Sequence, residues 1–390
     1  MTRPGVHDWT MLRAVGTKAL LACLLALGCA HRRATAEPTD AGVHPRPTTG
    51  VQSVPAPLPR PEPTVPPAVD APPTPRVERT HAPAQPTARE RELFFATPED
   101  PEPEVRGGIA KALEDVSYLV GNEWSLDAFV PTVSELGGGY IGVGPDQAYL
   151  FIGWQRPEYA WLIDYDSKVM RVHAMYRVLI GAAETPRELL ALFEPESAQR
   201  VSTLLAAAPE GAILRRMYRN NRDLFRWRLV TVQRKLAKRG VASWLDDDDM
   251  YAFVRQMVVN ERVRPMRVNL LDKAGMRGIA EAAAALEVPI RVVYLSNAEE
   301  YWREYAPQFR DNLAALPHDD RSVLLRTTLV WSTNRDYIYG AQQLDNFLAW
   351  LADPVVKSIE DLVGKKPKAE RGKINFVRFE SAPPSSAATQ

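Results

Sequence analysis

The sequence predicts an α/β fold: a doubly wound, mostly parallel sheet with a helical insertion between its second and third strands. Two observations predict it. Between residues 105 and 375, short runs of apolar residues alternate with longer segments of helical periodicity. The apolar runs contain few polar positions, which is typical of parallel strands whose two faces are both covered by helices.

Five apolar runs are predicted as strands: residues 139–144, 160–164, 264–272, 290–297 and 321–330. Helical periodicity follows the first three of them, at residues 146–155, 167–183 and 273–287, and a further helical pattern precedes them at residues 109–121. We therefore expect one large domain over residues 105–375.

Residues 184–263 form the predicted helical insertion, and part of it is strongly basic. Ten Arg or Lys side chains lie between Arg215 and Arg239, where Asp223 is the only acid. This segment is either a surface for an anionic polymer or lipid headgroups, or a solvated helix face whose other side packs on the sheet. The four acids at residues 246–249 are expected at a helix N-terminus, where negative charge is favourable.

The stretch GGGYIGVGPDQ at residues 137–147 places glycines at the junction between the first strand and the next helix. Glycine lets the backbone come close to a ligand, and ligands of open α/β sheets bind at the carboxyl ends of the strands. Asp164 ends the second strand twenty residues after Gly144, the spacing of a carboxylate that holds ribose hydroxyls. The alternative is structural: Gly142 and Gly144 permit a tight turn, and Asp164 caps the next helix.

Later strands also end in polar residues, Asp272 after the third and Asn297 after the fourth. With these residues the chain resembles the class I S-adenosylmethionine-dependent methyltransferases. The resemblance implies an S-adenosylmethionine site composed of the glycine turn, a ribose acid and an adenine acid: Gly142, Gly144, Asp146, Asp164 and Asp272. It also implies that Asn297 and Glu299 lie on the side of the methyl acceptor as catalytic residues. Residues 138–147, 162–166 and 293–301 also resemble an uncharacterised bacterial family of methyltransferase-like proteins, over most of residues 115–330.

The chain departs from the methyltransferase pattern in its glycine turn. Asp146 stands where a third glycine is usual, and the acid that commonly precedes the turn is absent. Other chemistries find little support. The predicted domain has two histidines, His173 and His318, and no cysteine, so we expect no metal site built from those ligands. The formal net charge of the chain is zero, which gives no specific nucleic-acid signal.

The N-terminus predicts export. Basic residues precede the apolar run ALLACLLAL at residues 19–27, followed by Gly28 and Cys29, which is the pattern of a signal peptide over residues 1–28. The ending LALGC resembles the lipobox of bacterial lipoproteins, which implies a lipidated Cys29 and a membrane anchor on the periplasmic or cell-surface side. The alternative is a plain cleaved signal with an incidental cysteine.

Residues 29–104 are rich in proline and poor in large apolar side chains, so we expect a disordered tether, with a shorter disordered tail at residues 376–390.

The predicted fold and the predicted export together allow two functions. The domain is either a catalytically silent module that binds a nucleoside-like ligand or an envelope protein, or an active S-adenosylmethionine-dependent methyltransferase. The methyl donor is made and kept in the cytoplasm, and this location, together with the altered turn, favours the silent module.

Overall fold

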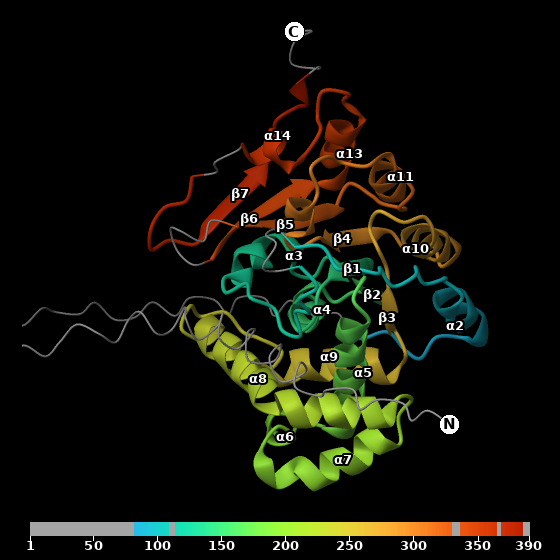
Figure 1. Ribbon diagram of the computed structural model, residues 1–390, viewed down its shortest axis with the longest axis vertical. Helices are drawn as coiled ribbons and strands as arrows, with labels where there is room; N and C mark the ends of the chain where they lie inside the picture. The colour runs from blue at the N-terminus through green and yellow to red at the C-terminus, as the bar shows by residue number, and fades with distance from the viewer. Residues whose placement is uncertain (1–81, 109–113, 330–335, 365–367, 385–390) are drawn as a thin grey trace, which may run out of the picture. The chain divides into compact units, whose positions relative to one another are not determined.

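The structure is a computed structural model that describes residues 82–108, 114–329, 336–364 and 368–384. Its centre is a seven-stranded sheet with the strand order β3-β2-β1-β4-β5-β6-β7 (Figure 1). All five predicted strands are present and pair in parallel: β1 (Gly139–Val143), β2 (Tyr159–Asp164), β3 (Val263–Arg267), β4 (Ile290–Tyr294) and β5 (Val323–Leu329). The predicted fold class is confirmed, and the order of the first five strands is that of Rossmann-like sheets.

Two further strands extend the sheet. β6 (Tyr337–Gln343) pairs antiparallel with β5, and β7 (Asn375–Phe379) pairs parallel with β6. The backbone after β7 is also fixed, because the carbonyl of Ser381 accepts a hydrogen bond of 2.9 Å from the Trp350 indole. The prediction of a disordered tail from residue 376 is therefore wrong for residues 376–384, and residues 385–390 lie outside the described part.

Helices cover both faces of the sheet, and the side chains of each strand alternate between the two layers (Figure 1). Tyr140 and Leu162 belong to a core with α4 (Gln147–Gln155), α5 (Ser167–Ala182) and α9 (Asp248–Val259). Their neighbours Ile141 and Trp161 point to a second core, formed with α10 (Ala274–Ala285), α11 (Pro307–Ala314) and α13 (Leu344–Ala352). Burial on both faces explains the nearly continuous apolar runs in the sequence.

The helical insertion lies between β2 and β3, as predicted. After α5 it contains α6 (Pro186–Ala191), α7 (Ala198–Ala206), the long α8 (Gly211–Ala237) and α9. α6 and α7 lie at the end of the domain opposite to α14 (Ile359–Val363) (Figure 1). Asp247 caps α9 by accepting a hydrogen bond of 3.0 Å from the Met250 amide, so the acids at 246–249 start a helix as expected. No metal-binding cluster of acids and histidines occurs among the described residues.

The folded part begins before residue 105, where the tether was predicted to end. Helix α2 (Ala88–Phe95) starts at a capping box made by Thr87 and Glu90. Phe94 is fully buried, with its ring centroid 5.0 Å from that of Trp161. Asp100 is also buried, and its carboxylate accepts hydrogen bonds of 3.1 and 3.0 Å from the first amides of α10. The prediction of disorder is thus wrong for residues 82–104.

Residues 114–121 form turns, bends and irregular backbone where the sequence predicted part of a helix, and residues 109–113 lie outside the described part. The same holds for the predicted signal peptide (1–28), for Cys29 and for the tether up to residue 81. Within the described ranges, no helix combines the length and the apolar character needed to cross a bilayer.

Candidate functional site

The order of the strands locates the place where such a sheet binds a ligand. The chain passes from β1 to β2 on one side and later continues to β4 on the other side of β1. Ligands of open α/β sheets bind at this reversal, outside the carboxyl ends of the two central strands. The candidate site is therefore the crevice between the end of β1 at Val143 and the end of β4 at Tyr294.

The glycine turn lies at this position, and the protein's own side chains fill the space beside it. Gly144 has φ = 95°, a conformation that favours glycine, and its amide donates a hydrogen bond of 3.2 Å to the carbonyl of Ile163 in β2. A Cβ atom on Gly144 would overlap Nε2 of Gln147, which itself donates 3.3 Å to the Val143 carbonyl. The glycine therefore makes room for Gln147 rather than for an open ligand cradle. In the same way, a Cβ atom on Gly142 would overlap the hydroxyl of Tyr140.

His173 supports the turn from behind. The side chain is fully buried, with Nε2 3.1 Å from the Gly144 carbonyl and Nδ1 3.2 Å from the hydroxyl of Tyr149. A carbonyl only accepts hydrogen bonds, so Nε2 carries the proton and Nδ1 accepts from the tyrosine. Burial lowers the pKa of His173 to about 4, which keeps the ring neutral at physiological pH. The histidine is structural, as the helical pattern around it indicates.

Asp146 holds the turn to the helical insertion. One carboxylate oxygen accepts a hydrogen bond of 2.6 Å from the Gly121 amide, and the other accepts 2.8 Å from Nε of Arg228. The ion pair is buried, since the Arg228 and Asp146 side chains are 0% and 3% exposed. Arg228 also donates 3.0 Å to the Glu123 carbonyl, and its guanidinium lies 4.7 Å from the ring centroid of Trp124. Residues 121–124 are thereby fixed across the end of β1.

Glu123 fills the end of β4. Its carboxylate accepts hydrogen bonds of 3.0 Å from the Tyr294 hydroxyl and 2.6 Å from the Ser296 hydroxyl, and the side chain is buried. Burial and the negative charge of Glu123 raise the pKa of Tyr294 well above its ordinary value. Glu123 belongs to the segment before β1, so a side chain from outside the sheet lies at the end of β4. Gln147, Asp146, Arg228 and Glu123 together occupy the crevice, and we refer to these four residues as the crevice network.

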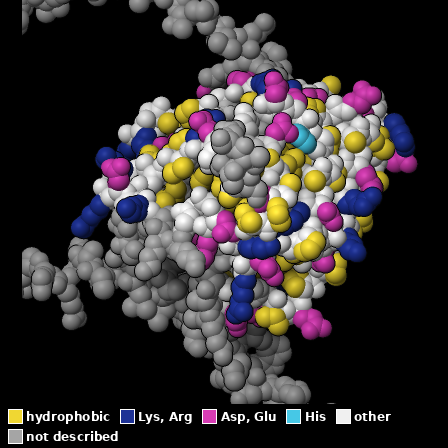
Figure 2. Space-filling view, turned by 90° about the horizontal axis from the view of Figure 1, so that it is seen from above, with side chains coloured by type: hydrophobic (Ala, Val, Ile, Leu, Met, Phe, Trp, Pro, Cys, Tyr) yellow, Lys and Arg dark blue, Asp and Glu magenta, His cyan; other side chains and the backbone are white. Residues whose placement is uncertain are grey.

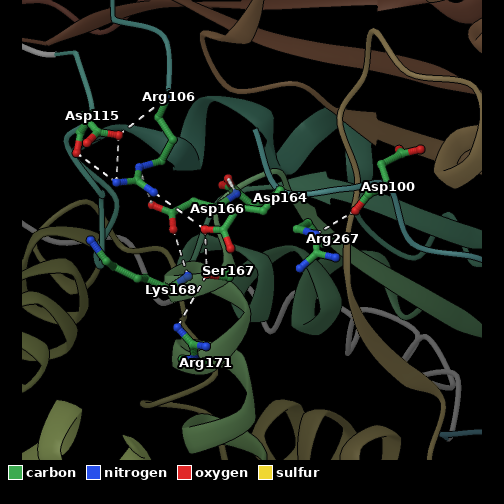
Figure 3. A network of polar contacts seen from close by, with 10 residues as sticks. Asp100, Arg106, Asp115, Asp164, Asp166, Ser167, Lys168, Arg171 and Arg267 are labelled. Atoms are coloured by element: carbon green, nitrogen blue, oxygen red, sulfur yellow. Dashed lines mark hydrogen bonds and ion pairs between the residues drawn. The ribbon is translucent and has the colours of Figure 1, made fainter. Parts of the chain in front are cut away.

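Asp164 ends β2 as expected, next to Ile163, whose carbonyl accepts from the Gly144 amide. Figure 3 shows Asp164 beside Asp166 at the start of α5. Its carboxylate accepts a hydrogen bond of 3.0 Å from the Asp166 amide. Asp166 caps α5 by accepting 2.8 Å from the Lys168 amide, and its other oxygen is 3.6 Å from Arg106. Burial, together with the charge of Asp166, raises the pKa of Asp164 to about 7. Such a carboxyl group exchanges its proton near neutral pH, which is a property of general acids and bases.

The remaining predicted residues do not converge on the turn through any contact of their side chains. Asp272 follows the end of β3 by five residues, and its carboxylate accepts 3.1 Å from the side-chain amide of Asn269. Asn297 donates 3.3 Å to Glu300. Glu299 is buried and accepts 2.7 Å from Nε of Arg326 and 2.6 Å from the Tyr305 hydroxyl. Asp272 thus lies in a turn before α10 and Glu299 in a separate buried ion pair.

Two residues of the crevice network carried no signal in the sequence. Glu123 lies in a segment without regular structure, and Arg228 is one of ten basic residues in a run that favours a solvated face. Both are identified only by the fold, because Arg228 meets Asp146 across 82 residues of chain. Asp146 itself was expected in the turn, in the position of a cofactor-binding residue, and here it is the partner of Arg228.

The comparisons with known proteins identify the family. Residues 118–378 match the model of a domain of unknown function (DUF7790), and the chain belongs to this family. No curated protein matches the chain. Among solved structures, one similar chain is described as the rRNA methyltransferase aviRa from Streptomyces viridochromogenes, with 12% identity, a TM-score of 0.24, and coverage of 52% of this chain and 71% of that chain. The fold assignment given above rests on the strand order and the pairing of the sheet.

Proposed function

We propose that the protein is an envelope lipoprotein whose folded domain is a catalytically silent, methyltransferase-like interaction module. The observation that carries this proposal is the crevice network. In a sheet of this order the reversal between β1 and β4 is where a cofactor binds. Here Gln147 takes the space beside Gly144, while the Asp146–Arg228 pair and Glu123 fill the ends of β1 and β4. A nucleoside would have to break a buried ion pair, and leaving one charge of such a pair buried and unpaired costs about 3–5 kcal/mol.

Export supports the same function. The signal-peptide pattern and the lipobox-like ending at Cys29 favour a location outside the cytoplasm, where the methyl donor is not supplied. A fold kept there without its cofactor acts by binding a partner in the envelope. The partner is a protein or a small ligand, and it does not enter through the crevice of the sheet.

The alternative function is methyl transfer from S-adenosylmethionine, and one observation favours it. Gly144 and Asp164 lie side by side at the ends of paired strands, as a methionine-binding turn and a ribose acid would. Calorimetry separates the two functions. We expect no heat when S-adenosylmethionine or S-adenosylhomocysteine is titrated into the full-length protein. Binding in the micromolar range that is lost in Asp164→Ala would establish the methyltransferase reading instead.

Lipidation is tested by metabolic labelling with radioactive palmitate. The chain has two cysteines, Cys23 inside the predicted signal peptide and Cys29 at its end, and they form a matched pair of variants. We expect label in the wild type and in Cys23→Ala, and no label in Cys29→Ala. Label that persists in Cys29→Ala, or an unlabelled wild type, would refute lipidation at Cys29. Neither result would bear on the proposal that the crevice binds no cofactor.

A further inference from the structure

Four arginines line one cavity on the helical insertion, and none of them belongs to the crevice network, whose Arg228 lies further along the same helix α8. The cavity has a volume of about 270 Å³ and lies between α7 and the first turns of α8. Its lining combines Arg215, Arg216, Arg219 and Arg222 with the small or polar side chains Ala198, Ser202, Ala212 and Tyr218. This lining contains no acid.

The orientation of α8 about its own axis places these arginines at the cavity. Positions 215, 219 and 222 follow the i, i+4, i+7 spacing of one helix face. The other face of α8 is anchored, because Leu214 and Phe225 are fully buried in the core. Tyr218, at the wall of the cavity, fixes the helix further by donating 2.6 Å to the Leu192 carbonyl. The helix cannot turn the arginines elsewhere without breaking this packing. The apolar face of the basic segment therefore packs in the core, as one of the two sequence interpretations expected. The basic face, however, lines a cavity.

The charges of the cavity are not balanced by the described part of the chain. Arg222 pairs with its neighbour Asp223 at 2.8 Å, and the next basic residue along α8, Arg226, pairs with Glu194 outside the cavity lining. For Arg215, Arg216 and Arg219, no ion pair is formed with any described residue. Like charges gathered on one helix turn repel one another. An anion in the cavity would relieve this repulsion.

The distribution of charge elsewhere is different. On the face around the C-terminal elements, Figure 2 shows acidic and basic side chains interspersed with hydrophobic ones. Helix α7, which lines the arginine cavity together with the start of α8, lies at the opposite end of the domain (Figure 1). The four arginines gather there in a chain whose formal net charge is zero.

We propose that this cavity binds a phosphate group. Guanidinium groups match the oxygens of phosphate with two parallel hydrogen bonds, and several of them around one concavity form an anion site of high charge. Ser202 supplies a hydroxyl at the wall, and Ala212 brings the N-terminal end of the 27-residue α8, whose amides favour negative charge. The phosphate is part of a soluble ester or of a lipid headgroup. The site stands independently of the proposed silence of the crevice.

The test compares two changes on the same helix. In Arg216→Gln/Arg219→Gln two cavity arginines are lost, whereas Arg234→Gln removes an exposed arginine of α8 that does not line the cavity. All proteins are full-length and carry Cys29→Ala, so that no lipid anchor contributes. One arm titrates inorganic pyrophosphate in the calorimeter at ionic strength matched with sodium chloride. The other arm measures sedimentation with vesicles of phosphatidylglycerol and phosphatidylcholine, against pure phosphatidylcholine.

We expect binding in at least one arm, weakened about tenfold or more in the double variant, because charge-assisted hydrogen bonds are lost, and nearly unchanged in Arg234→Gln. Pyrophosphate binding with this pattern identifies a soluble ligand, and vesicle binding alone identifies lipid headgroups. The inference is overturned if neither probe binds the wild type. It is equally overturned if Arg234→Gln weakens binding as much as the double variant, since the effect would then come from the general charge of α8.

Discussion

Replacement of Arg228 by methionine tests whether the crevice network holds the helical insertion to the sheet. Methionine keeps much of the volume of the arginine stem and removes the charge. Three interactions disappear with the guanidinium: the ion pair with Asp146 at 2.8 Å, the hydrogen bond of 3.0 Å to the Glu123 carbonyl, and the contact with the Trp124 ring at 4.7 Å. Asp146 is then left as a buried carboxylate with a single described donor, the Gly121 amide.

The size of the effect follows from this burial. Removing one partner of a buried ion pair destabilises a protein by about 3–5 kcal/mol, because the other charge stays desolvated and unpaired. A domain with a typical free energy of unfolding of about 5–15 kcal/mol would lose a large part of its stability. If Asp146 is replaced by asparagine in the same chain, the carboxylate that lost its partner is no longer charged. We therefore expect Asp146→Asn/Arg228→Met to be more stable than Arg228→Met alone.

The assay is urea denaturation followed by circular dichroism. Arg226→Met is the matched control, since Arg226 lies two positions earlier on α8 and its pair with Glu194 is about 40% exposed on both sides. This control should cost at most about 1 kcal/mol, as surface pairs do. The reasoning is refuted if Arg228→Met costs no more than the control, or if the double variant is less stable than Arg228→Met.

Three further changes probe other parts of the account. We expect Asp164→Asn to be more stable than the wild type at pH 8 and equally stable at pH 4. The native Asp164 carboxyl keeps its proton up to about pH 7, whereas the unfolded one releases it near its ordinary pKa of about 4, so the wild type loses stability as the pH rises between these two values. A difference in Tm that does not vary with pH would contradict this. Gly144→Ala should cost about 1–3 kcal/mol because the backbone is left-handed and the new Cβ meets Gln147; adding Gln147→Ala should restore part of the loss, and no recovery in urea denaturation would mean that Gln147 does not fill the space. Phe94→Ala should cost about 3–5 kcal/mol if the segment before residue 105 belongs to the core, and thermal unfolding at the wild-type temperature would show that it does not.

The sequence was sufficient for the central five strands and for the helices between them. These strands are buried on both faces, so their apolar runs are continuous and easily read. The sequence did not predict β6 and β7, and the structure shows a physical reason for each. Gln342 in β6 is buried because it accepts 2.7 Å from Arg326, a contact that a polar letter does not reveal. β7 lies at the edge of the sheet, where most of its side chains are exposed and no periodic burial exists.

The predicted start of the folded domain, residue 105, was too late because the proline-rich composition of the preceding residues indicated disorder. Prolines continue to residue 103, and only a few large apolar side chains stand among them. One of these, Phe94, packs against Tyr159 and Trp161 of β2. Asp100 accepts from the Gly275 amide at the start of α10, 175 residues along the chain. Such contacts depend on the folded partner surface and leave no local pattern in the sequence. The turn itself was located correctly, because glycine with a positive φ at a strand end is a local property.

A crystal structure of the protein grown with saturating S-adenosylhomocysteine tests the filled crevice most directly. The account predicts no ligand density beside Gly144, with the Gln147 amide still donating to the Val143 carbonyl and Arg228 still paired with Asp146. A nucleoside bound between the glycine turn and Asp164, with Gln147 turned away, would contradict it.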